Sequence, residues 1–585
     1  MSLRPRPFHV AVAFAFVAAA ILLSRPPVTQ WSPDCASKYL QLIAIRFDHG
    51  LRFDIPYAGR PFDPNLHAVP IGESYYDRVG GEIHMAWPAL FAVVTWPFWK
   101  VFGWFGIFVL PIGCGAISVA LTGLVADRIR PGTGWIASLL VAVVTPVLVY
   151  STLYWEHTIA LALELSALVL VLDFAARPRR WRLLVGGILT GLGAAGFRGD
   201  VAVFAVALFG AVFLVARGRE RWVVPPLVGA GFAIGCIPGA FLNLTLNGHI
   251  SPPNAVNNTQ RPSFAYLESV HFVGIVPHIL VGKTVPSELA WQTTLAVLVL
   301  VAAFYAGRRL PAPLRLALLV AAVVALGATS LRELDATRDG AFHGWLAMCP
   351  VLALGLLRSE APLDDPARTG RRVVALSAAF VLTIVCVTIG TAYPNGWASD
   401  HNLEWGPRYW LVVFPLMAVL VAVNGDALLG AFRAPGVAAA WRWVGVGAAV
   451  GLTVVSFLFI RLGLVRIRRM LVEQGGFRGL LLERPEEPLL TDTFAVSALA
   501  PEDFESRPSF YIRFQNPEWF APWLAGAVAN GLSGFGLATF AGSNHPFLRQ
   551  DVSSCGCSLK VESIDKSGGL TMIHVRVLRP GADTR

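Results

Sequence analysis

The chain has 585 residues, of which 55% are hydrophobic and only 14% are charged, and its formal net charge at pH 7 is +10. Soluble domains carry about 25% charged residues, so this composition, with a mean hydropathy of +0.59, excludes a soluble globular enzyme. The seven cysteines are too sparse for a disulfide-rich secreted scaffold.

Apolar runs of about 20 residues recur along the chain between short Arg-rich breaks, a pattern typical of helices that cross a bilayer. Thirteen membrane-spanning helices are expected, near residues 8–24, 105–126, 133–153, 157–175, 182–197, 200–217, 222–243, 289–307, 312–331, 342–357, 372–392, 409–424 and 442–463. The predicted fold class is therefore an all-α polytopic membrane protein.

The arginines of the short connections indicate the topology. Twenty arginines fall in connections on the side of the N-terminus, and only Arg198, Arg332, Arg338 and Arg408 fall in the short connections opposite. Since basic residues mark the cytoplasmic side, the N-terminus is expected inside and the C-terminus outside, and the positive charge is topological rather than a nucleic-acid surface. Residues 1–24 are expected to be a signal anchor, because Ser24 is followed by Arg-Pro-Pro rather than by the small residues of a signal-peptide cleavage site.

Three segments are too long to be connectors, and all three fall on the outer side. Residues 25–104 are polar and end in an apolar, Trp-rich stretch that is expected to lie as an interfacial helix among the lipid headgroups. Residues 244–288 are rich in Asn and Pro. Residues 464–585 have the composition of a small soluble α/β or α+β domain, with a strand-like end at Leu570–Leu578.

The first outer segment carries an acidic candidate about ten residues beyond the first span. Asp34 could accept a proton from a hydroxyl that arrives from outside, with Lys38 and Tyr39 holding a nearby phosphate or sugar. The same Asp34 could instead be the N-cap of an amphipathic helix, and the local residues favour both interpretations equally.

Two further motifs lie at outer helix boundaries. Glu156 and His157 either contact a substrate or merely terminate a helix, where an acidic residue is favoured by the helix dipole. Arg198 lies on the outer side against the charge bias, which suggests a functional partner such as a phosphate, although Asp200 could neutralise it.

A third motif, Glu404–Trp410, places an arginine at a helix start. Gly406 and Pro407 predict a sharp turn that opens a helix, and Arg408 follows at its N-terminus, where a guanidinium can bind a lipid phosphate bidentately. The alternative is an interfacial anchor flanked by Trp405 and Tyr409.

The sequence lacks the nucleotide-binding loops, the His-Glu-x-x-His motif and the Cys-x-x-Cys pairs of soluble enzymes. Cys555 and Cys557 are too close together for a usual zinc knuckle and are expected to be structural. In one alternative, one of them is bonded to Cys35.

Taken together, the order and placement of these motifs resemble the GT-C superfamily of membrane glycosyltransferases, which use polyprenyl-phosphate-linked sugars as donors. Bacterial members with a periplasmic C-terminal domain are the most similar. The resemblance covers nearly all of residues 1–463, a transmembrane catalytic module, and covers 464–585 weakly. The segments that carry it are Asp34–Tyr39, Pro88–Gly103, Trp155–Thr158, Arg198–Asp200, Asn243–Gly248 and Trp405–Tyr409.

The resemblance implies transfer of a hexosyl or pentosyl group, with inversion, to an envelope lipid, polysaccharide or protein acceptor on the outer face of a bacterial cytoplasmic membrane. Asp34 would be the catalytic base, and Arg408, Arg198 and Lys38 would bind the donor phosphate. The substrate-binding candidates are Tyr39, Glu73, Asp77, Glu156, His157, Asp200, Trp405 and Tyr409.

One position departs from the family pattern. Many members have a second acidic residue directly after the Asp, and here that residue is Cys35. No metal ligands or cofactor are therefore assigned, a divalent ion (Mg or Mn) is left open, and Glu73 and Asp77 are the first candidates for the missing carboxylate.

The sequence leaves two other classes of function open, a transporter and a non-catalytic scaffold. A transporter or flippase of lipid-linked saccharides fits the number of spans, but it should show internal repeats with charged groups in mid-span, and only Glu164 has such a position. A non-catalytic scaffold for polysaccharide assembly would require Asp34 to be dispensable.

Overall fold

The computed structural model describes residues 7–23, 32–47, 51–71, 75–216, 218–251, 294–295, 297–298, 312–336, 345–356, 364–392, 411–433, 439–492, 501–511, 517–540, 557–567 and 569–578. The chain divides into two compact units. Unit 1 comprises Met1–Ser24, Phe108–Ala240 and Thr259–Val465, and unit 2 comprises Arg25–Ile107, Phe241–Asn258 and Arg466–Arg585. Unit 2 thus draws on segments close to the three expected outside the membrane.

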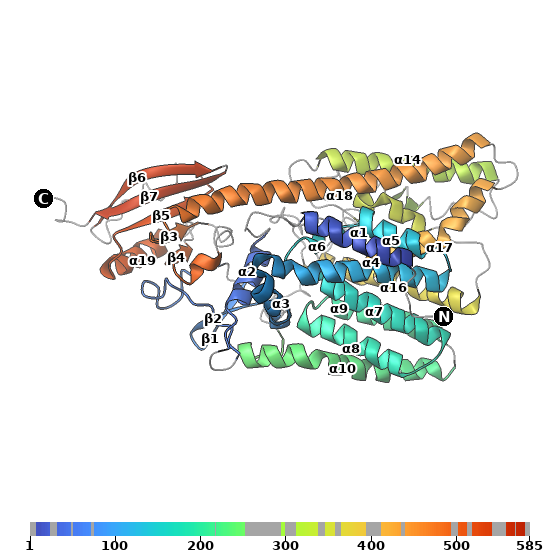
Figure 1. Ribbon diagram of the computed structural model, residues 1–585, viewed down its shortest axis with the longest axis horizontal. Helices are drawn as coiled ribbons and strands as arrows, with labels where there is room; N and C mark the ends of the chain where they lie inside the picture. Colours follow the sequence, from blue (N-terminus) through green and yellow to red (C-terminus); the bar gives the residue numbers. More distant parts are fainter. Residues whose placement is uncertain are drawn as a thin grey trace. The chain divides into compact units, whose positions relative to one another are not determined.

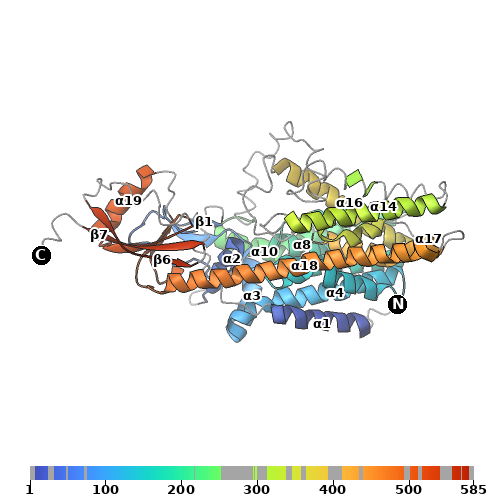
Figure 2. The ribbon, with the colours of Figure 1, turned by 90° about the horizontal axis from the view of Figure 1, so that it is seen from above.

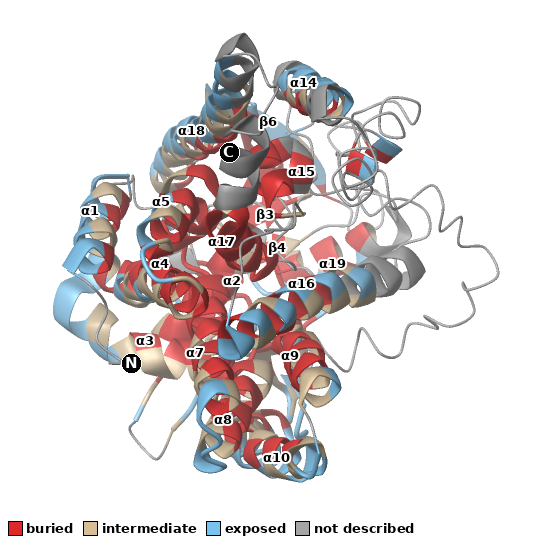
Figure 3. Cartoon of the chain, turned by 90° about the vertical axis from the view of Figure 1, so that its right-hand side faces the viewer, coloured by how far each residue is buried: buried red, intermediate tan, exposed pale blue. Residues whose placement is uncertain are grey.

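Unit 1 is a bundle of helices in which α4 lies beside α1, α5, α7 and α17 (Figure 1). Figure 3 shows buried residues concentrated on α4, α7 and α17, and exposed faces on α1, α10 and α14. Two long helices, α10 and α18, begin in unit 1 and end in unit 2. The elements of unit 1, with these two, are α1 (Pro7–Leu23), α4 (Val109–Ile129), α5 (Gly134–Val144), α6 (Val147–Ser151), α7 (His157–Ala176), α8 (Trp181–Gly196), α9 (Val201–Val215), α10 (Glu220–Asn247), α14 (Ala312–Ala336), α15 (Trp345–Met348), η3 (Pro350–Leu356), α16 (Asp365–Ala392), α17 (Val413–Arg433) and α18 (Ala439–Leu482).

The exposed faces of the bundle are apolar. Among the described residues, four helical stretches are long and apolar enough to cross a membrane: Ala89–Ile129, His157–Ala176, Glu220–Asn247 and Val446–Leu482. Large side chains such as Phe14, Trp222 and Trp443 are at least 70% exposed on the helices. Water disfavours such a surface and lipid does not, so the chain is an integral membrane protein.

Most of the thirteen expected spans coincide with helices, but the structure does not confirm that number of crossings. The expected span 133–153 is divided into α5 and α6 at Thr145 and Pro146. The expected span 342–357 is built from α15 and η3, which meet at Pro350. Proline lacks the backbone N–H that a continuous helix needs, which explains both interruptions. Most of the expected span 289–307 lies outside the described residues.

Glycines form a close seam between α8 and α10. Gly187 and Gly191 on α8 are spaced as in Gly-x-x-x-Gly, as are Gly231, Gly235 and Gly239 on α10. A Cβ added at any of the five would lie within 3.0 Å of a backbone carbonyl oxygen of the other helix. Membrane helices associate through such close backbone packing, because lipid supplies no hydrophobic force to bring them together.

Unit 2 begins with α2 (Pro33–Ile43) and a hairpin of β1 (Tyr76–Val79) and β2 (Glu82–Met85), whose turn places Gly80 and Gly81 at positive φ. Then α3 (Ala89–Phe102) leads through η1 (Gly103–Phe108) toward α4, and Lys100 lies 4.6 Å from the ring centroid of Trp99. The interfacial position of this stretch stays a prediction.

The C-terminal part of unit 2 contains a five-stranded mixed sheet of order β4-β3-β5-β7-β6 (Figure 1). Its strands β6 and β7 are seen side by side in Figure 2. β3 pairs in parallel with β4 and β5, and β7 pairs antiparallel with β5 and β6. The predicted strand Leu570–Leu578 is β7, so the small C-terminal sheet region is confirmed. The elements are β3 (Leu489–Thr491), η5 (Pro501–Phe504), β4 (Ser509–Tyr511), α19 (Pro517–Ala529), β5 (Gly534–Thr539), β6 (Ser558–Ser567) and β7 (Leu570–Leu578).

The N-terminal segment of unit 2, Arg25–Ile107, and its C-terminal region share one hydrophobic core. Tyr57 packs against Phe504 and Phe510 at ring-centroid distances of 5.6 and 6.4 Å. The backbone N–H of Tyr511 donates to the carbonyl of Ala68 at 2.7 Å. The edge strand β4 is therefore bonded to a residue more than 400 positions earlier in the chain.

We expect Gly235→Leu to separate α8 from α10 and to lower the free energy of unfolding by about 3 kcal/mol, because its side chain would overlap the carbonyl of Ile188. The measurement is the thermal unfolding midpoint of purified protein in detergent. Gly229→Leu is the matched control on the same helix, since a Cβ there meets nothing within 4 Å. Equal midpoints for the two variants would contradict the close seam.

Candidate functional site

Four of the predicted site residues come together in unit 1, at the start of α7 and in the turn between α8 and α9. Both oxygens of Asp200 accept hydrogen bonds from the Arg198 guanidinium, each at 2.9 Å. The same guanidinium lies 3.6 Å from Glu156 Oε1 and donates to His157 Nε2 at 2.5 Å. Residues 41 positions apart thus form one network.

Local structure explains this convergence. Glu156 is the N-cap residue of α7 and Asp200 is that of α9, yet neither side chain caps its helix. Both carboxylates turn toward Arg198 instead. Glu156 thus lies at a helix start, as the sequence predicts, and its side chain also faces Arg198.

An aromatic wall supports the network. The ring of Tyr150 stacks on His157 at 5.0 Å and on Trp155 at 5.6 Å. His157 and Trp155 are almost fully buried, as is Tyr150. Since Arg198 is the donor to Nε2, the neutral imidazole carries its proton on Nδ1. Tyr150 was not among the predicted site residues, because it lies on α6, the helix before the Trp155–Thr158 motif.

The balance of charge in this cluster is negative. The side chain of Arg198 is only 11% exposed, and two carboxylates face it. Glu164, two turns further along α7, lies within electrostatic reach of Arg198 and Asp200. A buried guanidinium requires such partners, so Asp200 does neutralise Arg198, as one of the two expectations held. A donor phosphate would have to compete with Asp200 for the fork of Arg198.

A second group of predicted residues lies on α2 in unit 2. Ser32 is the N-cap, since its Oγ accepts the N–H of Cys35 at 3.3 Å, and Asp34 lies in the first turn. The prediction that Asp34 could be the N-cap is therefore wrong. Asp34 is partly exposed, whereas the eight residues 35–42 that follow it are buried.

The buried face of α2 is held against aromatic side chains. Lys38 Nζ lies 4.2 Å from the ring centroid of Trp87, whose Nε1 donates to Ser37 Oγ at 2.7 Å. Tyr39 packs edge-on against Trp104 at 5.2 Å, and burial raises the pKa of its hydroxyl above the usual value. These contacts hold α2 rigidly, while the phosphate-binding role of Lys38 stays a prediction.

The other predicted residues have separate outcomes. Asp77 lies on β1 opposite His84, and its Oδ1 accepts the N–H of Arg78 at 2.8 Å. Cys35 is a buried thiol outside any disulfide and Cys557 is disulfide-bonded, so the alternative that pairs Cys35 with a C-terminal cysteine is wrong. Four predicted site residues lie outside the described residues: Glu73, Trp405, Arg408 and Tyr409.

Across the part of the chain that the structure describes, no cluster of three or more His, Cys, Asp or Glu side chains is arranged as a metal site. We therefore assign no ligands for Mg or Mn.

No protein-family model matches the chain, and the comparison with curated proteins found no match. Solved structures do match. ArnT from Cupriavidus metallidurans bound to undecaprenyl phosphate is 12% identical with a TM-score of 0.49, covering 96% of this chain and 97% of that one. The archaeal oligosaccharyltransferase AglB from Archaeoglobus fulgidus, in complex with an inhibitory peptide and a dolichol-phosphate, is 12% identical with a TM-score of 0.47, covering 92% and 70%.

These neighbours are GT-C glycosyltransferases. Because the TM-scores are below 0.5, the function proposed below rests on this chain's own residues.

We expect Asp200→Asn to lower the free energy of unfolding by about 3 kcal/mol, because it leaves the buried Arg198 without its bidentate partner. Thermal unfolding of the purified protein measures this change. Asp365→Asn is the control: that carboxylate is 85% exposed and pairs with Arg368 at 3.3 Å. A surface pair of this kind contributes about 0–1 kcal/mol. Equal thermal unfolding midpoints for Asp200→Asn and Asp365→Asn would contradict the buried network.

Proposed function

We propose that the chain is a GT-C-type membrane glycosyltransferase that transfers a sugar from a polyprenyl-phosphate-linked donor to an envelope acceptor, at the outer face of a bacterial cytoplasmic membrane. The observation that carries the proposal is the placement of Asp34. Asp34 is a partly exposed residue in the first turn of a short helix whose following residues are buried and held by Trp87 and Trp104. A general base needs this combination of access and rigidity.

In the proposed reaction, Asp34 accepts the proton of the acceptor hydroxyl as that oxygen attacks the anomeric carbon of the sugar. The bond between the anomeric carbon and the phosphate oxygen breaks on the opposite side, and the polyprenyl phosphate leaves with the bonding electron pair. Configuration at the anomeric carbon is inverted. Asp34→Asn would remove this role, because an amide cannot accept the proton as a carboxylate does.

Negative charge develops on the departing phosphate, and we assign its stabilisation to Arg408, with Trp405 and Tyr409 beside it in sequence. A fixed guanidinium stabilises the leaving phosphate more strongly in the transition state than in the ground state. Lys38 and Tyr39 are proposed as further contacts to the donor.

The Arg198 network receives a positioning role within this proposal. Since Asp200 occupies the guanidinium fork, Arg198 orients Glu156 and His157 rather than serving as the main phosphate ligand. Carboxylates and a neutral imidazole are groups that hydrogen-bond sugar hydroxyls. We therefore place Glu156 and His157 among the sugar or acceptor contacts, with Asp77 and Glu73 as candidates in unit 2.

The alternative function is transport or flipping of a lipid-linked saccharide. It is favoured by one observation: Glu164, buried inside a candidate membrane-spanning helix, lies within electrostatic reach of Arg198 and Asp200. Ionisable groups buried within a membrane bundle often serve ion or substrate pathways.

The test compares the wild type with Asp34→Asn and Arg408→Ala, purified in detergent and given radiolabelled polyprenyl-phosphate sugars with envelope extracts. We expect Asp34→Asn to lose about 10²–10⁴-fold in turnover while it still binds the donor, because general base catalysis contributes that much. We expect Arg408→Ala to weaken donor binding by about tenfold or more, as a charge-assisted contact is lost.

Asp54→Asn is the matched control in the same outer segment, since its carboxylate is already paired with Arg52 at 2.8 Å. It should retain wild-type turnover. If Asp34→Asn and Arg408→Ala matched the wild type, or if reconstituted protein moved the lipid-linked saccharide across vesicles without transferring a sugar, the glycosyltransferase proposal would be replaced by the transport alternative.

A further inference from the structure

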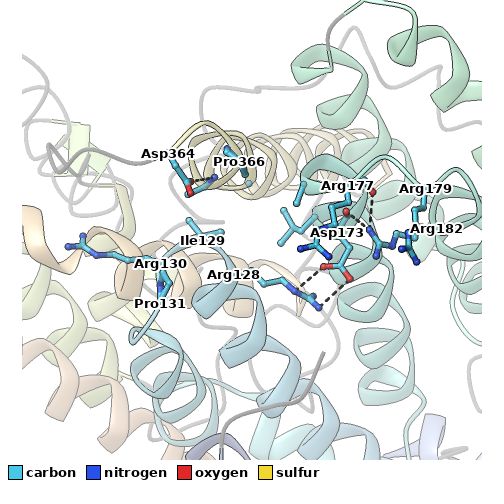
Figure 4. A pocket seen from close by; sticks show the side chains of 14 residues that line it. Arg128, Ile129, Arg130, Pro131, Asp173, Arg177, Arg179, Arg182, Asp364 and Pro366 are labelled. Atoms are coloured by element: carbon cyan, nitrogen blue, oxygen red, sulfur yellow. Dashed lines mark hydrogen bonds and ion pairs between the residues drawn. The ribbon is translucent and has the colours of Figure 1, made fainter. Parts of the chain in front are cut away.

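A basic cavity of about 560 Å³ lies in unit 1, where α4 and α7 end and α16 begins (Figure 4). It is at the opposite end of α7 from His157, and a 20-residue helix spans about 30 Å. It is therefore separate from the Arg198 network. Five arginines line it: Arg128, Arg130, Arg177, Arg179 and Arg182.

The cavity has an excess of positive charge, because only two acidic residues, Asp173 and Asp364, line it. Asp173 forms an ion pair with Arg128, in which Oδ1 lies 3.1 Å from Nε. Asp364 is committed to the backbone, since its Oδ1 accepts the N–H of Ala367 at 2.8 Å. The five lining arginines exceed the two lining carboxylates by three, so the lining carries a formal charge of +3.

Two of the five lining arginines present their charge to solvent. Arg177 and Arg179 lie in the connection between α7 and α8, and both are exposed. Within the described ranges, neither side chain has an ion-pair partner. Arg182, by contrast, donates to the carbonyls of Asp173 and Arg177 and so satisfies the end of α7.

A helix start adds to this potential. The first turns of α16, a helix of 28 residues, supply Pro366, Ala367 and Gly370 to the cavity lining. The N-terminus of a helix carries a partial positive charge and attracts anions. The carbonyls at the end of α7 would oppose it, but Arg182 already binds them and Arg128 binds Val169 O.

We propose that this cavity binds a phosphate group, either as a phospholipid headgroup or as a free phosphate. Arginine forks match the geometry of phosphate oxygens, and a volume of about 560 Å³ is in the range of small-ligand sites, roughly 300–1,000 Å³. The cavity lies at the ends of apolar helices, where phospholipid headgroups meet the membrane surface. Arg177 and Arg179 are its principal ligands.

The test uses full-length protein and two probes. One is radiolabelled inorganic phosphate in equilibrium dialysis. The other is fluorescent phosphatidylglycerol, measured as retention by the protein in phosphatidylcholine nanodiscs. We expect saturable binding of at least one probe, weakened about tenfold or more in Arg177→Gln/Arg179→Gln, because each arginine supplies charge-assisted hydrogen bonds.

The matched control is Arg180→Gln/Arg219→Gln. It removes the same charge from the same end of the bundle, but neither residue lines the cavity, and Arg180 is only in a surface pair with Glu220 at 3.8 Å. Binding that is kept in the control and lost in the cavity variant supports the site. Binding of phosphatidylglycerol alone assigns a lipid headgroup, and binding of inorganic phosphate assigns a free phosphate. No saturable binding of either probe, or equal loss in both double variants, overturns the proposal.

Trp181 offers an independent readout, because Arg182 lies 5.7 Å from its ring centroid and its side chain is half exposed. Titration with the bound probe should change tryptophan fluorescence in the wild type and less in Trp181→Phe. An identical change in both proteins would contradict binding at this end of α7.

Discussion

The rest of the structure depends on the pairing of buried charges, of which Arg198 is the clearest case. Its guanidinium is held by both oxygens of Asp200 and faces Glu156. In a bundle of apolar helices, a charged or polar group has to find its partners within the protein. The helix-start residues Glu156 and Asp200 are turned away from capping for this reason. The start of α7, the α8–α9 turn and the Tyr150–Trp155 aromatic wall are thereby joined into one rigid element.

Close packing stabilises the association of helices in lipid, where the hydrophobic effect does not drive them together. The α8–α10 seam brings backbones together at glycines, and Asp127 stabilises the turn between α4 and α5 by accepting the N–H groups of Gly132 and Gly134. In unit 2, by contrast, an ordinary water-excluding core joins the segment Arg25–Ile107 to the C-terminal sheet. Each unit is stabilised by the kind of packing that its solvent permits.

The two ends of α7 differ in charge. At its start, carboxylates outnumber the arginine, and a neutral imidazole completes the set. At its end, arginines outnumber carboxylates around an open cavity. A hydroxyl-rich ligand suits the first environment and an anion suits the second, so one helix connects two chemically distinct proposed sites.

The membrane class, most of the helices and the final strand followed from sequence, because hydrophobicity and its periodicity are local properties of the chain. Each motif of the Arg198 network was predicted from the sequence, but their contact was not. His157 and Arg198 are 41 positions apart, and no local pattern links them. The interruptions at Pro146 and Pro350 were missed because the apolar runs continue through them.

What the sequence alone determined is therefore the membrane class, the positions of most helices and the residue types at their ends. Tertiary structure alone decided that Asp200 accepts hydrogen bonds from Arg198, that Ser32 rather than Asp34 caps α2, and that arginines of separate connections line one cavity. The physical reason is that pairing energy depends on distance in space, and the folding of long helices brings together groups far apart in the chain.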